Sequence, residues 1–197
     1  MSFRKENKYR ISSSEVFQMQ TTLIDLGMYE LHPGRLVSSC YFDTHNFTLF
    51  RESEEGTLPR KKVRIRWYDG VMKLQKEQKI SSIEGRYKTV TDISNITCES
   101  DLLKLTHFDQ TYGCLGPKLI ISYYRQYFKL ESLRLTFDQN ISYQYVNSEV
   151  LPTMHDKECV MEVKVPIGTE EGYVENLIPF PTSRFSKYAR GVLHFGL

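Results

Sequence analysis

The sequence predicts a mainly β (α+β) fold: an antiparallel eight-stranded tunnel barrel with a polar, cationic lumen and flanking helices. Three observations lead to this prediction. Short segments that alternate apolar and charged residues recur along all 197 residues, an Asp-Gly pair joins two of them, and Lys and Arg dominate the charged positions. Closing such a sheet with its charged rows inward would line a channel with cations.

The clearest hairpin lies between Arg60 and Lys88. Arg64 and Arg66 alternate with apolar residues, and the alternation resumes at Val71 after Asp69-Gly70. Asp-Gly readily adopts the positive φ angles of a two-residue hairpin turn, so this segment predicts two antiparallel strands.

The register of this hairpin predicts a basic face. With Tyr68 opposite Val71, Lys62 lies opposite Glu77, and the other cations share that side of the sheet. Because like charges on neighbouring strands repel, a bound anion would relieve the conflict. An ordinary solvated basic face is the alternative.

The remaining elements follow in order. Alternation over 3–11 predicts the first strand, and Ser12 with Glu15 signals the start of a helix that Gly27 ends. A turn at 32–34 leads to a strand over 36–43, and 44–59 is a polar connection. The later predictions are strands over 86–90, 118–130, 133–138 and 159–165, with helices over 100–111, 169–177 and after 184.

Composition limits the class of protein. The net charge of +2 is too small to indicate a nucleic-acid partner. The four cysteines show no metal-ligand spacing, so reduced thiols are expected, as is usual in the cytoplasm. No apolar run is long enough to span a membrane. We expect a single domain over 1–197 in the cytoplasm, near the membrane only through a partner.

A Glu stands two residues before a Lys in three predicted strands, at Glu6, Glu77 and Glu162. Closely spaced Lys and Arg suit a phosphate chain, since phosphoryl oxygens accept charge-assisted hydrogen bonds. Carboxylates among them could hold a divalent metal that bridges the phosphates. In the alternative interpretation each Glu only neutralises a neighbouring cation.

The chain resembles the triphosphate tunnel metalloenzyme (CYTH-like) superfamily, and within it the VTC (vacuolar transporter chaperone) polyphosphate polymerase domain. The segments that carry the resemblance are Glu6-Asn7-Lys8-Tyr9, Ser39-Cys40-Tyr41-Phe42-Asp43-Thr44, Arg64-Ile65-Arg66-Trp67-Tyr68, Glu77-Gln78-Lys79, Gly85-Arg86-Tyr87-Lys88, Tyr123-Tyr124-Arg125, Arg134-Leu135-Thr136-Phe137-Asp138, Met161-Glu162-Val163-Lys164 and Phe185-Ser186-Lys187-Tyr188.

The resemblance implies an ATP-dependent polyphosphate polymerase, a phosphotransferase that moves the γ-phosphoryl group of ATP onto a polyphosphate chain. It implies Mn²⁺ or Mg²⁺ as cofactor, with Glu162 as the leading ligand and Glu6 and Glu77 as further ligands. The residues it implies for phosphate binding and catalysis are Lys8, Arg64, Arg66, Lys79, Lys88, Arg125, Arg134, Lys164 and Lys187, with Arg86 and Ser186 as additional phosphate contacts.

One departure from the superfamily pattern bears on the activity. Arg4 stands where the hydrolases of the superfamily carry the first carboxylate of an E-x-E-x-K motif. Fewer acids to hold metal and activate water disfavour hydrolysis. A metal-dependent triphosphatase and a non-catalytic polyphosphate sensor or scaffold nevertheless stay open as alternatives. The oligomeric state and the partner that would export a product are not predicted.

Overall fold

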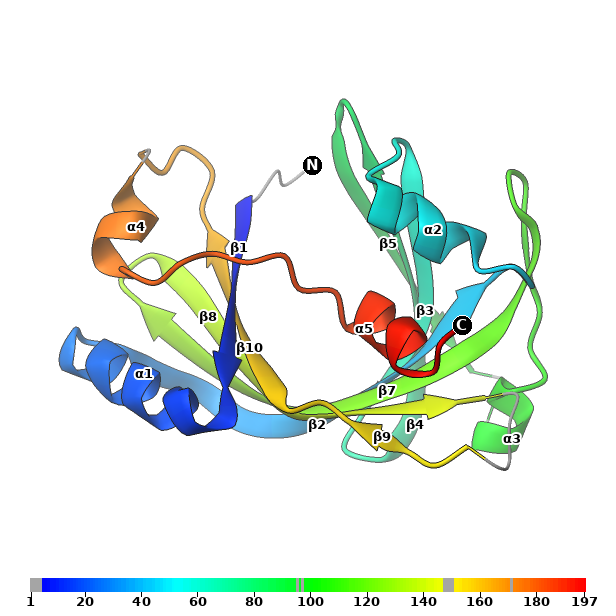
Figure 1. The fold of residues 1–197 in the computed structure, drawn as a ribbon, viewed down its shortest axis with the longest axis horizontal. Coiled ribbons are helices and arrows are strands. Elements are labelled where there is room, and N and C mark those ends of the chain that lie inside the picture. The colour runs from blue at the N-terminus through cyan, green and yellow to red at the C-terminus, as the bar shows by residue number, and fades with distance from the viewer. Residues whose placement is uncertain (1–4, 95, 97, 147–150, 171) are drawn as a thin grey trace. The chain divides into compact units, whose positions relative to one another are not determined.

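The computed structural model describes residues 5–94, 96, 98–146, 151–170 and 172–197, without the side chains of residues 5 and 72 (Figure 1). The strands are β1 (Lys5–Ser12), β2 (Tyr29–Asp43), β3 (Arg60–Tyr68), β4 (Val71–Ser82), β5 (Gly85–Ile93), β6 (His107–Asp109), β7 (Gly113–Leu130), β8 (Leu133–Tyr145), β9 (Met154–His155) and β10 (Glu158–Val165). The helices are α1 (Ser13–Asp25), α2 (Thr48–Glu55), α3 (Glu99–Leu102), α4 (Tyr173–Leu177) and α5 (Lys187–His194).

Hydrogen bonds connect eight strands in the order β1-β10-β8-β7-β2-β3-β4-β5, with β6 against β7 and β9 against β8. Every pair with a resolved register is antiparallel. The predicted fold class, mainly antiparallel β with few helices, is therefore confirmed. Among the described residues, hydrogen bonds do not join the end strands β1 and β5 to each other.

The chain divides into two compact units. The first unit comprises Met1–Arg35, Tyr123–Ile141 and His155–Phe185, and the second comprises Leu36–Ser122, Ser142–Met154 and Ser186–Leu197. Strands β2, β7, β8 and β9 contribute residues to both units. The single domain over 1–197 stays a prediction.

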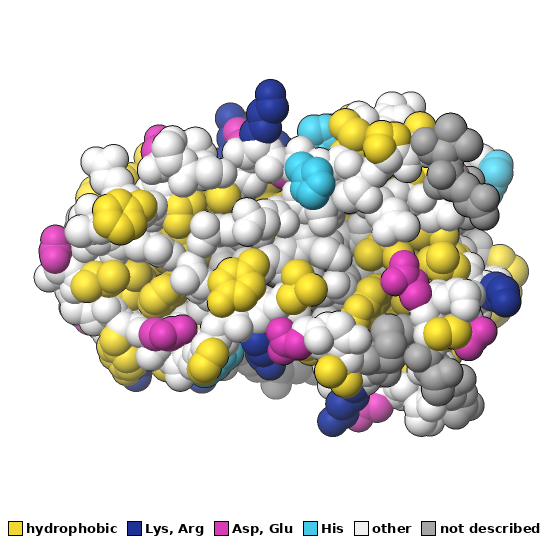
Figure 2. All heavy atoms as spheres, turned by 90° about the horizontal axis from the view of Figure 1, so that it is seen from below, with side chains coloured by type: hydrophobic (Ala, Val, Ile, Leu, Met, Phe, Trp, Pro, Cys, Tyr) yellow, Lys and Arg dark blue, Asp and Glu magenta, His cyan; other side chains and the backbone are white. Residues whose placement is uncertain are grey.

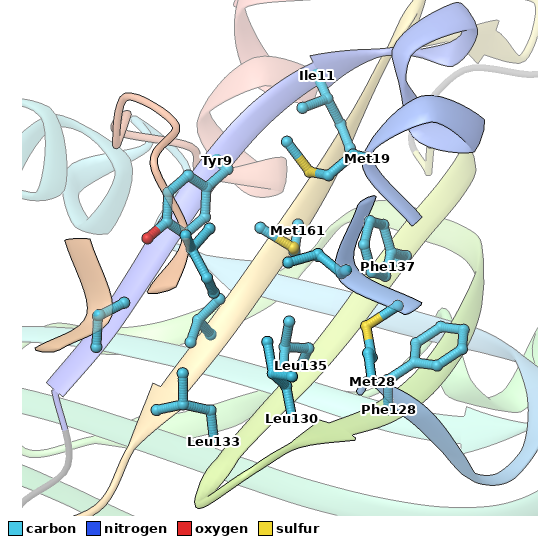
Figure 3. Close-up of a cluster of buried hydrophobic side chains, with 14 of the residues drawn as sticks. Tyr9, Ile11, Met19, Met28, Phe128, Leu130, Leu133, Leu135, Phe137 and Met161 are labelled. Carbon is cyan, nitrogen blue, oxygen red and sulfur yellow. The ribbon is translucent and has the colours of Figure 1, made fainter. Parts of the chain in front are cut away.

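In the first unit, α1 packs on the apolar rows of β1, β10 and β8. Figure 3 shows the side chains of Met19, Tyr9, Met161 and Leu135 gathered in this cluster, and all four are buried. The helix begins as the sequence predicts, because the Glu15 carboxylate accepts hydrogen bonds from the backbone N–H and the hydroxyl of the N-cap residue. Because α1 covers the apolar side of these three strands, their charged side chains lie on the opposite side of the sheet.

In the second unit, the apolar rows of β3 and β4 form a separate core. Val63, Ile65, Trp67 and Leu74 are all 5% exposed or less. The predicted apolar side of the hairpin is therefore confirmed, and the basic side faces away from this core.

The predicted register of the hairpin is wrong beyond its turn. Tyr68 pairs with Val71 as expected, but an irregularity in β4 then places Glu77 opposite Arg64 and Lys79 opposite Lys62. Two extra residues of β4 are accommodated there, and a shift by two keeps every side chain on its predicted face. The shift brings the carboxylate opposite an Arg.

Three predicted elements also differ. The turn at 32–34 lies inside β2, where the tight approach of the Tyr124 ring leaves no room for a Cβ at Gly34. The connection 44–59 contains α2, since buried Asp43 accepts the backbone N–H groups of Leu49 and Phe50 at its start. Residues 100–111 contain the end of short α3 and then β6, not one helix. Positions 3 and 4 lie outside the described residues.

The cysteines differ in their exposure to solvent. All four cysteines are free, with Cys40 and Cys159 buried and Cys98 and Cys114 exposed. In the part of the chain that the structure describes, no helix is both long and apolar enough to cross a membrane. Figure 2 shows one face on which exposed hydrophobic side chains are scattered and Lys and Arg lie mainly toward the edges.

Candidate functional site

In the second unit, three lysines stand side by side across three strands. Lys79 of β4 lies directly opposite Lys62 of β3 and Lys88 of β5. Like charges at directly opposed positions destabilise a sheet. The row therefore favours an anion that compensates its charge.

Glu77 of β4 binds one lysine of this row, Lys88, and cations surround it. Its carboxylate accepts hydrogen bonds from Arg64 Nε (2.8 Å) and Nη2 (2.5 Å) and from Lys88 Nζ (2.8 Å). Arg66 Nη1 lies 3.7 Å away. Burial alone would raise the pKa of Glu77, but Arg64, Arg66 and the hydrogen bonds lower it to about 2. Glu77 is therefore a charged anchor for three cations.

Strand β3 lies between β2 and β4. Tyr41 and Ser39 of β2 bind the two arginines from the strand opposite to the one that carries Glu77. Arg64 Nη1 donates to the Tyr41 hydroxyl at 2.9 Å, and Arg66 Nε donates to Ser39 Oγ at 3.2 Å. Burial alone would raise the pKa of Tyr41, but Arg64, Arg66 and Lys62 lower it to about 8. Both guanidinium groups are thus oriented by neutral partners as well as by Glu77.

Behind Tyr41, the Asp43–Tyr188 pair connects β2 with α5. The Tyr41 and Tyr188 rings are stacked with centroids 5.0 Å apart, and the Tyr188 hydroxyl donates to Asp43 Oδ2 at 2.8 Å. Asp43 is fully buried, and burial raises its pKa although its hydrogen bonds lower it. Asp43 and Tyr188 thus fix the position of Tyr41, whose hydroxyl binds Arg64.

The predicted phosphate contacts Ser186 and Lys187 lie at the start of α5. Ser186 is the N-cap, its hydroxyl oxygen accepts from Ala189 N, and Lys62 Nζ lies 3.3 Å from the same oxygen. Lys187 is buried, with 9% exposure. Arg86, by contrast, is exposed and stands opposite Ser81.

In the first unit, two charged rows cross β1, β10 and β8. One row places Glu6 opposite Lys164, which stands opposite Arg134. Arg134 is exposed, while Glu6 and Lys164 are half-buried. Glu6 can compensate the charge of Lys164, whereas Lys164 and Arg134 are like charges at directly opposed positions.

The second row places Lys8 opposite Glu162, which stands opposite Thr136. Lys8 Nζ donates to the Phe185 carbonyl at 2.7 Å and lies 3.5 Å from Glu162 Oε1. Arg125 of β7 reaches the same carboxylate, with Nη2 3.3 Å from Oε2. Two predicted cations thus meet at the predicted leading metal ligand.

Arg125 is held chiefly by Asp138 of β8. Its Nε and Nη2 donate to the two Asp138 oxygens at 2.5 and 2.6 Å. Burial lowers the pKa of Arg125, but Tyr123, Asp138 and Glu162 raise it above its ordinary value. The pair is bidentate and buried, which makes Arg125 a rigid cation.

The carboxylates differ in how well they fit a divalent metal. Glu77 does not fit, because its two oxygens already accept from Arg64 and Lys88. Glu162 fits better, because its cation contacts are 3.3 and 3.5 Å and Glu6 lies one row away on the same side of β1 and β10. No three His, Cys, Asp or Glu side chains form a metal-binding group in the described ranges. The other ligands of Mg²⁺ or Mn²⁺ would therefore be water or phosphate oxygens.

Sequence reasoning missed four residues of these clusters. Lys62, Ser39, Asp138 and Thr136 were each on a charged or polar row but matched no expected role. The strand alternation could have indicated these four residues, because it places them on the same side of their strands as the cations that were assigned. Only the register across strands shows which of them meet.

The match to a family model shows the family to which the chain belongs. The VTC domain model matches residues 3–96 and 71–195. The chain belongs to the VTC domain family. No curated protein matches the VTC domain described here significantly.

Solved structures with the same fold are distant in sequence. A candidate adenylate cyclase from Vibrio parahaemolyticus is 15% identical, with a TM-score of 0.56 and 98% of each chain covered. A candidate adenylate cyclase from Bacillus halodurans is 16% identical, with a TM-score of 0.56 and 99% of each chain covered. A conserved hypothetical protein from Pyrococcus furiosus is 14% identical, with a TM-score of 0.56, covering 94% of the VTC domain and 99% of its own chain. At these identities the likeness concerns the fold alone.

Proposed function

We propose that this VTC domain binds ATP and polyphosphate and transfers the γ-phosphoryl group of ATP onto a polyphosphate chain. The observation that carries the proposal is the row of Lys62, Lys79 and Lys88, directly opposed on three strands. A phosphate chain offers several negative oxygens at intervals that a row of cations can share. Membership in the VTC family supports polyphosphate as the chain.

Phosphoryl transfer needs positioning and charge neutralisation, and each unit by itself contains residues suited to it. Arg64 and Arg66 are held by Glu77, and Arg125 is held by Asp138, so their donors need little reorganisation when phosphate binds. A divalent metal, when bound, would neutralise phosphate charge; Glu162 and Glu6 are its proposed protein ligands.

The remaining site assignments belong to the same proposal. They comprise phosphate contacts by Lys8, Arg86, Arg134, Lys164, Ser186 and Lys187. The cytoplasmic location and a membrane-protein partner, through which the protein would lie near the membrane, also belong to the proposal. A metal-dependent triphosphatase would use the same cations, and a sensor would need no metal.

The three functions give different products. We expect the purified protein with ATP and Mn²⁺ to form polyphosphate, detected on gels, and the E162A variant to form none. Orthophosphate release without polymer would instead identify a triphosphatase. Tight polyphosphate binding that E162A leaves unchanged, with no turnover in the wild type, would identify a sensor. Absence of both binding and turnover with a polyphosphate primer present would refute the proposal.

A further inference from the structure

The hydroxyl group of Thr136 is buried without a partner. Thr136 is 7% exposed, and its Oγ1 has no hydrogen-bond partner among the residues that the structure describes. Leaving a buried hydroxyl unpaired costs free energy, whereas valine, of nearly the same shape, would avoid that cost. The polar residue at this position therefore calls for a partner that the described residues do not supply.

The surroundings of Thr136 indicate the chemistry of that partner. Thr136 stands opposite Glu162, which stands opposite Lys8, so the three share one side of the sheet. Arg125 lies within 3.3 Å of Glu162 and binds Asp138, the next residue but one on this side of β8. The carboxylates of Glu162 and Asp138 are thus already paired with cations. A bound group that accepts a hydrogen bond from the Thr136 hydroxyl would lie close to Lys8 and Arg125, and these two cations favour an anion.

We propose that Thr136 is a ligand-binding residue whose hydroxyl donates a hydrogen bond to a phosphoryl oxygen of the bound triphosphate or polyphosphate. This inference rests on the proposed function, which assigns phosphate to the same side of the sheet. It adds a neutral donor to a set of charged ones. A hydrogen bond from a neutral, buried hydroxyl orients the phosphate, and dissolved salt weakens this bond little. Salt does weaken the electrostatic attraction between the phosphate and exposed lysines.

The test compares T136V, which removes the hydroxyl, with T136S, which retains it. Inorganic triphosphate is the probe, and isothermal titration calorimetry measures its Kd. We expect T136V to raise Kd about tenfold and T136S to stay within about threefold of the wild type. The increase in T136V should be the same at low and high salt. T89V, the same substitution at an exposed position of β5, is the matched control and should change nothing.

Stability without ligand separates binding from folding. If the hydroxyl serves only the ligand, T136V should unfold at the same or a higher urea concentration than the wild type. Wild-type triphosphate affinity in T136V would overturn the inference while leaving the proposed function intact. So would a loss of stability in unliganded T136V that T136S restores, because it would show an internal role. A wild-type protein that binds no triphosphate would refute both proposals.

Discussion

Replacing Glu77 by glutamine removes the charge on which three cations converge while keeping the size of the side chain. Burial alone would raise the pKa of Glu77, but Arg64, Arg66 and the hydrogen bonds lower it from 4.5 to about 2. A carboxylate whose pKa is lower in the folded than in the unfolded state stabilises the folded state above both values. The difference corresponds to about 3 kcal/mol at neutral pH.

We therefore expect E77Q to lower the free energy of unfolding by about 3 kcal/mol at neutral pH, measured by urea denaturation. The wild type should lose the same amount as the pH falls from 4.5 toward about 2, because Glu77 then becomes protonated. E77Q should lack this part of the acid sensitivity, so the two proteins should converge in stability at low pH.

The control is E84Q, the same substitution at an exposed residue between β4 and β5. It should match the wild type at every pH. Because E77Q leaves Arg64, Arg66 and Lys88 uncompensated, added inorganic triphosphate should also restore more stability to E77Q than to E84Q. The reasoning is refuted if E77Q is as stable as the wild type at neutral pH, or if it loses as much stability in acid.

Further predictions concern Tyr41 in the second unit and Arg125 in the first. With its pKa lowered to about 8, Tyr41 should ionise first among the tyrosines in an ultraviolet difference titration, and Y41F should abolish that step. Because the phenolate would pair with Arg64, triphosphate affinity should fall as the pH rises through this value in the wild type but not in Y41F; equal pH profiles would contradict this. R125M leaves the buried Asp138 carboxylate without its bidentate partner, so urea denaturation should show a loss of about 3–5 kcal/mol. A loss under about 1 kcal/mol would mean that this pair behaves like an exposed one.

The strand alternation was enough to predict which side of each strand is apolar, because a residue's side of a sheet depends only on its parity along the strand. Trp67 and Leu74 are buried as that parity requires. The start of α1 was also predictable, since Ser12 and Glu15 are local signals. The helix that follows Asp43 was not, because a buried carboxylate several residues upstream initiates it.

The sequence by itself determined the antiparallel β class, the charged rows and the family motifs, all of which are local or nearly local properties of the chain. Only the tertiary structure decided which charges meet. An irregularity of two residues in β4 places Glu77 opposite Arg64, and the pairing of β8 with β10 places Thr136 opposite Glu162. The first pairing depends on an irregularity inside the hairpin that the alternation does not show, and the second joins strands that are not consecutive in the chain.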